Sequence, residues 1–149
     1  MSYAIVIIVV LVALAPLWQF MPTKGQRRVA KLRETAALEG LFVEFRDLPL
    51  AAEKLTRLPA SERQVLYYGI RLKPSRGEPR ARRAWVYEKG EWRSEPLGNP
   101  EPDALSQLPD VVLAASISEA SCGVFWREEG DEDRVRDIAV SLKEWSGAL

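Results

Sequence analysis

Two groups of side chains in this sequence have the types and spacing that could support chemistry. The first is a run of carboxylates, Glu128, Glu129, Asp131, Glu132 and Asp133, which could hold a divalent cation. The run lacks the regular oxygen spacing and the downstream glutamate of a calcium loop, and Asp131 or its neighbour stands where the N-cap of a helix is expected. We therefore interpret it as the start of a helix.

The second group is a set of basic residues that leads into aromatic ones. It consists of Arg71, Lys73, Arg76, Arg80, Arg82 and Arg83, followed by Trp85 and Tyr87. Such a pattern can bind nucleic acid or lipid headgroups, and it is also typical of a solvated strand edge and loop. We expect Arg80, Arg82 and Arg83 to contact anionic lipid or an acidic protein partner, and we do not expect nucleic acid.

The rest of the catalytic inventory is small. The chain has no histidine, which excludes Ser-His-Asp and Cys-His arrangements and the usual zinc ligands. Its single cysteine, Cys122, lies in the apolar run CGVFW and is interpreted as an inert buried thiol. We predict no catalytic residues, no cofactor, no metal and no enzymatic activity, the alternative being an enzyme that uses carboxylates or lysine alone.

The amino-terminal stretch Tyr3–Phe20, YAIVIIVVLVALAPLWQF, has no charge over eighteen residues. As a helix it reaches about 27 Å, close to the hydrocarbon core of a bilayer, and predicts a single transmembrane span. Tyr3 and Trp18 suit the two interfaces, and Pro22 ends the helix.

Two other interpretations of this stretch are a buried core helix and a cleaved signal peptide. Ala13-Leu14-Ala15 resembles a small-x-small cleavage site. No basic residue precedes the run, however, and Pro16 would follow the cut directly. The transmembrane anchor is therefore the preferred interpretation.

The charges that follow the span predict its orientation. Lys24, Arg27, Arg28, Lys31 and Arg33 come without an intervening acid, and basic flanks stay on the cytoplasmic side. We expect a bacterial inner-membrane protein with the amino terminus outside and the remaining residues in the cytoplasm. The lipid bilayer is then one partner, and a membrane protein or an acidic protein is expected to be another.

The same basic residues predict an amphipathic helix after the span. Lys24, Arg27, Arg28 and Lys31 fall in one stripe, and Val29, Leu32 and Ala36 form a neighbouring apolar stripe. Either the basic stripe lies on an anionic leaflet or the apolar stripe packs on the domain, and both remain open.

Three segments result: an anchor at residues 1–22, a juxtamembrane amphipathic helix at 23–40, and a cytoplasmic domain at 41–149. Charge is unevenly spread, because the region from Lys24 to Arg93 carries a net charge of +8 and the region from Ser94 to Leu149 carries −8. Such a division favours packing of the two parts on each other, or oppositely charged faces toward partners.

Alternation and turn residues predict the elements of the domain. Expected strands are Leu41–Phe45, Glu62–Lys73, Ala84–Glu88, Glu91–Ser94, Val111–Ile117 and Cys122–Arg127, with a hairpin turn at Lys89-Gly90. Expected helices are Gly25–Glu39, a short one at Asp103–Leu108, and Glu132–Trp145, with Leu50–Leu58 as a turn or helix. The order predicts an α+β fold with an antiparallel sheet, helices on one face and a C-terminal helix.

The amino-terminal plan resembles small single-pass inner-membrane proteins of Gram-negative bacteria. It is similar to the YajC accessory subunit of the preprotein translocase in its uncharged span followed by MPTKGQRR and KLRETAALEGL, which covers about the first 45 residues. YajC-type proteins continue with a G-D-x-V pattern, where this chain has Gly40-Leu41-Phe42-Val43. The resemblance implies an accessory role in protein translocation.

The function expected from these observations is a membrane-anchored cytoplasmic interaction or accessory module with no evident catalytic site. The alternatives are a YajC-like accessory subunit and an enzyme that uses carboxylates or lysine only.

Overall fold

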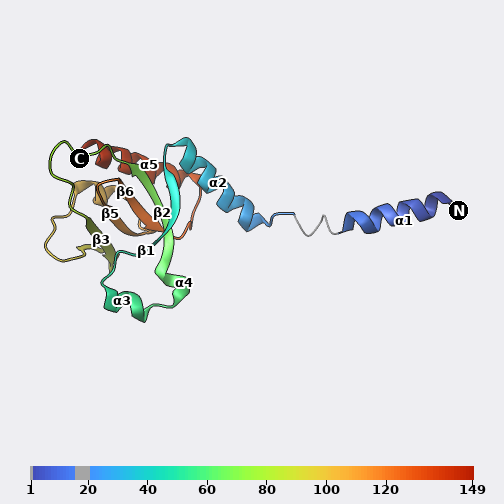
Figure 1. Cartoon of the computed structure of the whole chain (residues 1–149), viewed down its shortest axis with the longest axis horizontal. Coiled ribbons are helices and arrows are strands. Elements are labelled where there is room, and N and C mark those ends of the chain that lie inside the picture. The colour runs from blue at the N-terminus through green and yellow to red at the C-terminus, as the bar shows by residue number, and fades with distance from the viewer. Residues whose placement is uncertain (1, 16–20) are drawn as a thin grey trace. The chain divides into compact units, whose positions relative to one another are not determined.

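The computed structural model describes residues 2–15 and 21–149. It divides into two compact units, Met1–Ala30 and Lys31–Leu149, and the division falls inside helix α2 (Figure 1). The first unit contains helix α1, Ser2–Leu14, and the start of α2, Lys24–Leu38. The second unit contains the sheet and the remaining helices.

Helix α1 overturns the predicted membrane anchor. It has 13 residues, which span about 20 Å, whereas a bilayer core is about 30 Å thick. Across residues 2–15 and 21–149, no helix combines the length and the apolar character needed to cross a membrane. The prediction of a single-pass inner-membrane protein with an outward amino terminus was therefore wrong, because it counted on one helix continuing to Phe20, and residues 16–20, with Trp18 among them, lie outside the described residues.

Six strands form one antiparallel sheet in the order β1-β2-β6-β5-β3-β4. Their bounds are β1 Phe42–Asp47, β2 Gln64–Arg71, β3 Arg83–Glu88, β4 Glu91–Ser94, β5 Val112–Ile117 and β6 Ser121–Trp126. The β3–β4 hairpin turns at Lys89 and Gly90, both at positive φ, as its two-residue connection requires. The predicted α+β fold with an antiparallel sheet and a C-terminal helix is confirmed.

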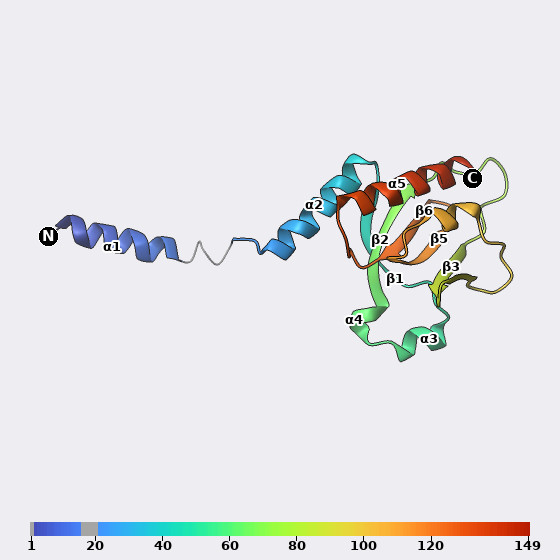
Figure 2. The same cartoon turned by 180° about the vertical axis from the view of Figure 1, so that it is seen from behind.

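Helix α5, Glu132–Gly147, covers one face of the sheet (Figure 2). Asp131 caps it by accepting a hydrogen bond from the backbone N–H of Arg134, 3.2 Å away, as the sequence predicted. Its buried stripe includes Leu142 and Trp145, and the Trp145 ring meets the edge of Trp85 with centroids 5.8 Å apart. This layer is the main core.

The second half of α2 is joined to this core within the unit that begins at Lys31. Leu32 and Ala36 are fully buried, and the Arg33 guanidinium donates two hydrogen bonds, of 2.8 and 2.9 Å, to the Glu128 carboxylate. Glu128 also accepts a 2.7 Å hydrogen bond from the Tyr68 hydroxyl and has a positive φ of 55°. Leu32 and Ala36, the part of the apolar stripe that lies in this unit, therefore pack on the domain, which is one of the two arrangements left open by the sequence.

Three short helical segments complete the domain: α3, Ala52–Arg57; α4, Ala60–Arg63; and the 3-10 helix η2, Asp103–Gln107. η2 contributes the buried Leu105 to the main core. Leu55 and Leu58, from α3 and its C-cap, pack instead against the opposite face of the sheet, with Leu48 and Leu50. Helices thus lie on both faces, where the sequence analysis expected them on one.

Candidate functional site

The candidate site lies on the face of the sheet that points away from α5, called the open face from here on. Successive side chains alternate between the faces of a strand, so Tyr68 and Val124 point to α5 whereas Tyr67 and Phe125 point to the open face. Leu48, Leu50, Leu55 and Leu58 cover part of the open face. The uncovered part carries arginines, hydroxyls and glycines.

Tyr67 lies across the centre of the open face because two glycines make room for its ring. Gly69 on β2 is paired with Gly123 on β6. A Cβ added to either glycine would lie 2.5 Å from a carbon of the Tyr67 ring, which no side chain could accept without movement. The ring packs edge-on against Phe125 with centroids 4.9 Å apart, and its hydroxyl lies 3.4 Å from Oγ of Ser121. Burial raises the pKa of Tyr67, so the phenol is a neutral hydrogen-bonding group.

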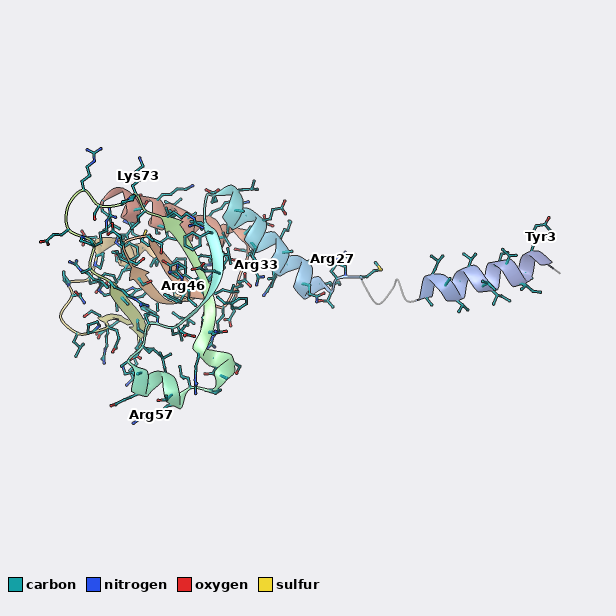
Figure 3. The ribbon with its side chains drawn as sticks, viewed as in Figure 1. Tyr3, Arg27, Arg33, Arg46, Arg57 and Lys73 are labelled. Carbon is teal, nitrogen blue, oxygen red and sulfur yellow. The ribbon has the colours of Figure 1, made fainter. Side chains whose placement is uncertain are left out.

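The guanidinium of Arg46, on the edge strand β1, lies over this ring. Arg46 is labelled in Figure 3. Its guanidinium carbon is 3.9 Å from the Tyr67 centroid, a cation–π distance, and a terminal nitrogen lies 3.4 Å from Oγ of Ser121. Glu44, two residues earlier on the same strand, forms an ion pair with Arg46. Arg46 is thus held in place, and it forms one wall of a cleft of about 480 Å3, the arginine cleft.

The opposite wall of the arginine cleft carries Arg82 with Ser116 and Ser118. Arg82 directly precedes β3, is exposed, and has no ion-pair partner among residues 2–15 and 21–149. A guanidinium offers a planar fork of N–H donors that matches a carboxylate or a phosphate, and serine hydroxyls can add further donors. The cleft can therefore bind an anionic group.

A second depression of about 540 Å3 adjoins the arginine cleft, and Asp47 and Arg82 line both. Its other walls come mainly from apolar side chains: Leu48, Pro49, Leu50, Ala51, Leu55, Ala84 and Pro96. A basic, hydroxyl-lined cleft and an apolar depression thus share one arginine. This arrangement suits a ligand that presents an anionic group next to an apolar one.

Glu119, in the β5–β6 turn, fixes the loop that leads to Arg82. Its carboxylate accepts hydrogen bonds from the backbone N–H groups of Ser75, at 2.8 Å, and Arg80, at 2.6 Å. These bonds, that of Ser75 first, lower the pKa of Glu119. The Arg80 side chain folds back to donate to the backbone oxygen of Lys73 at 2.8 Å. Arg80 therefore shapes the loop, and Arg82 is left available to a ligand.

The other basic residues singled out in the sequence are distributed over different elements. Arg83 is exposed and lines the apolar depression. Lys31 forms a 2.7 Å ion pair with Glu132 at the start of α5, which raises the pKa of Lys31 and lowers that of Glu132. Three further basic residues are exposed at the start of α2: Lys24, Arg27 and Arg28.

Three residues of the arginine cleft were not predicted from the sequence: Arg46, Ser116 and Ser118. A signal was present, because alternation along the second strand places Tyr67 and Arg71 on one face. What the sequence lacked was the strand order. β1 and β5 are separated in the sheet by β2 and β6, and only the folded sheet places Arg46 and Ser116 on the same cleft.

The first group of candidate residues, the carboxylate run, supports the fold. Glu128 binds Arg33 and Tyr68, Asp131 caps α5, and Glu132 binds Lys31. In the described part of the chain, no group of three or more Cys, Asp or Glu side chains could hold a metal ion. Cys122 is fully buried on the α5 side of the sheet, and burial raises the pKa of its thiol to about 11, as expected for an inert thiol.

No protein-family model matches the chain, and searches of curated proteins and of solved structures gave no match either. The resemblance to the YajC accessory subunit therefore stays a prediction, and the geometry of the open face is the basis for a functional proposal.

Proposed function

We propose that this protein is a non-catalytic interaction module whose open face binds an acidic segment of a partner protein. The observation that carries the proposal is the position of Arg82, an exposed guanidinium without an ion-pair partner in the described residues, on the rim shared by the arginine cleft and the apolar depression. A carboxylate of the partner would bind between Arg82 and Arg46, with Ser116 and Ser118 as further donors. An adjacent apolar side chain would occupy the depression beside Leu50 and Leu55.

The chemistry of the cleft favours recognition. The guanidinium groups of Arg46 and Arg82 are poor proton-transfer groups, and the raised pKa of Tyr67 makes that phenol a weak acid. A charged rim around a shallow apolar surface is typical of protein-binding surfaces, where arginine is enriched. An enzyme that uses carboxylates or lysine alone remains the alternative, and it would be favoured by turnover that depends on Asp47, the one carboxylate shared by both depressions.

Fluorescence anisotropy with the full chain tests the proposal. The probe is a fluorescein-labelled peptide of alternating glutamate and leucine residues, and the control peptide has glutamine in place of glutamate. We expect Arg82→Ala to weaken binding about five- to tenfold, the effect of losing one partly exposed charge-assisted contact. Arg57→Ala is the matched control, because Arg57 is an exposed arginine on α3 that lines neither depression (Figure 3).

Two results would contradict the proposal. One is equal affinity for the glutamate and glutamine peptides. The other is equal loss of binding in Arg82→Ala and Arg57→Ala, which would indicate a general effect of net charge.

A further inference from the structure

The outer edge of the sheet at β1 has the features of a self-pairing surface. β1 is the first strand in the sheet order and is hydrogen-bonded to β2 on one side. Within the described residues, no strand pairs with its other side. Phe45 is 64% exposed, an unusual position for a phenylalanine in the middle of a strand.

The hydrogen-bond pattern shows which backbone groups of β1 point outward. The N–H of Leu48 donates to the backbone oxygen of Arg63 at 3.0 Å, and this bond continues the register in which Arg46 faces Val65. Backbone groups alternate in direction along a strand, so the even-numbered residues of β1 bind β2. The N–H and C=O groups of Val43, Phe45 and Asp47 therefore point away from the sheet.

The side chains beside these groups are self-complementary. Glu44 and Arg46 flank Phe45 and project on the open face, with opposite charges. In an antiparallel pair centred on Phe45, Glu44 of each strand lies opposite Arg46 of the other. Shifting the pair by two residues, the smallest step that keeps the outward backbone groups facing each other, places Glu44 opposite Glu44 or Arg46 opposite Arg46. Like charges directly opposite are destabilising, so one register is selected.

We propose that β1 pairs antiparallel with β1 of a second copy of this chain, with Phe45 on the two-fold axis. Phe45 then lies opposite Phe45, and Val43 lies opposite Asp47. The outward N–H and C=O groups of these three residues bond across the axis, and the two sheets join into one. Such an interface is closed by its symmetry, and it covers an exposed strand edge. The proposal requires no acidic ligand, because it rests on the edge of β1, although Arg46 takes part in both the strand pairing and the arginine cleft.

Cysteine cross-linking of the full chain tests the register. Residues directly opposite in a hydrogen-bonded antiparallel pair have Cα atoms about 5.5 Å apart, within the range that a disulfide can bridge. We expect Phe45→Cys to form a disulfide-linked dimer under mild oxidation at least about ten times faster than Val43→Cys, because two copies of Val43 lie four residues out of register. Cys122 is fully buried and serves as an unreactive internal reference.

Charge exchange tests the same pairing with Phe45 in place. Sedimentation equilibrium of the full chain in a non-ionic detergent, which covers the exposed apolar side chains of α1, measures dimer dissociation. We expect Glu44→Arg or Arg46→Glu alone to raise the dissociation constant about tenfold or more, since each places like charges opposite, and the double exchange to restore it to within about threefold.

Either measurement can overturn the proposal. Cross-linking of Phe45→Cys that is no faster than that of Val43→Cys rejects the register, and a doubly exchanged chain as weak as the single variants rejects the pairing. Thermal unfolding by circular dichroism checks that each variant is folded. Peptide binding separates this proposal from the preceding one. Arg82→Ala should lower the affinity for the peptide and leave the dissociation constant of the dimer unchanged.

Discussion

The two faces of the sheet are built from the same six strands and differ in what covers them. The face under α5 is closed by large apolar side chains, among them Trp85, Trp126 and Trp145, which are at most 4% exposed. The open face has small residues at its centre, Gly69, Gly123 and Ser116, with arginines at its rim. One face therefore holds the fold together, and the other leaves polar groups accessible to a partner.

The largest expected effect in this comparison comes from the closed face. We expect Trp145→Ala to lower the free energy of unfolding by about 3 to 5 kcal/mol, because it removes a buried aromatic ring and leaves a cavity beside Trp85. Urea unfolding followed by circular dichroism measures the change. Val140→Ala on the exposed side of α5 is the control and should change stability by less than about 0.5 kcal/mol. A loss below about 1 kcal/mol for Trp145→Ala would mean that α5 is not docked on the sheet.

On the open face, the glycine pair should be the most sensitive position. We expect Gly123→Ala to destabilise the domain by about 1 to 3 kcal/mol, the usual range for overpacking, because the added Cβ meets both the Tyr67 ring and the backbone of β2. Gly147→Ala is the control, since a Cβ there meets nothing within 4 Å. Equal stability of the two variants, measured by urea unfolding, would show that Tyr67 does not lie across the glycines.

The free energy of unfolding at alkaline pH provides a comparison of Tyr67 and Tyr68, which are adjacent in the chain and point to opposite faces of the sheet. Burial, then the hydrogen bond to Glu128, raises the pKa of Tyr68 in the folded state, whereas Ser121 and Arg46 oppose the rise at Tyr67. A raised pKa contributes stability that is complete below the unfolded pKa near 10 and is lost as the pH rises further. We expect stability to fall above about pH 10, and Tyr68→Phe to reduce that slope by about 1.4 kcal/mol per pH unit.

Unfolding curves in urea between pH 9 and pH 12 would provide this slope for each chain. Tyr67→Phe is the matched variant and should reduce the slope less. A greater reduction in Tyr67→Phe than in Tyr68→Phe would contradict the assignment of the larger rise in pKa to Tyr68.

The smallest expected effect concerns the rim of the open face. Arg46→Ala should cost about 0.5 to 1 kcal/mol of stability, the value of a partly exposed cation–π contact. Thermal unfolding measures this cost, and Arg57→Ala, at an exposed arginine, is the reference variant. A cost above about 2 kcal/mol would place Arg46 among the structural residues, in contrast to the role proposed here.

The sequence was sufficient to predict most helices and strands, and insufficient to predict which of them lie next to each other in the sheet. Alternation around Tyr68, the Lys89-Gly90 turn and the helical spacing of Val135, Ile138 and Leu142 all carry local information. The six strands and α5 were predicted near their observed bounds, whereas α4 was not predicted. The arginine cleft depends on the strand order and on the Arg46 side chain, which extends from β1 over Tyr67 toward Ser121 on β6. No local sequence pattern encodes either feature. The membrane prediction assumed one helix from Tyr3 to Phe20, whereas α1 covers Ser2–Leu14 and no helix within residues 2–15 and 21–149 is long and apolar enough to cross a membrane.

The labelling rate of Cys122 can report how often this molecule opens. It is the only thiol in the chain, it is fully buried in the main core, and burial raises its pKa to about 11, so a thiol reagent reacts with it only when that core opens. The labelling rate, divided by that of an unfolded thiol at the same pH, therefore gives the population of opened molecules under native conditions. No probe has to be introduced. A ligand that binds the open face would lower the labelling rate, and the size of the decrease would report the free energy of its binding.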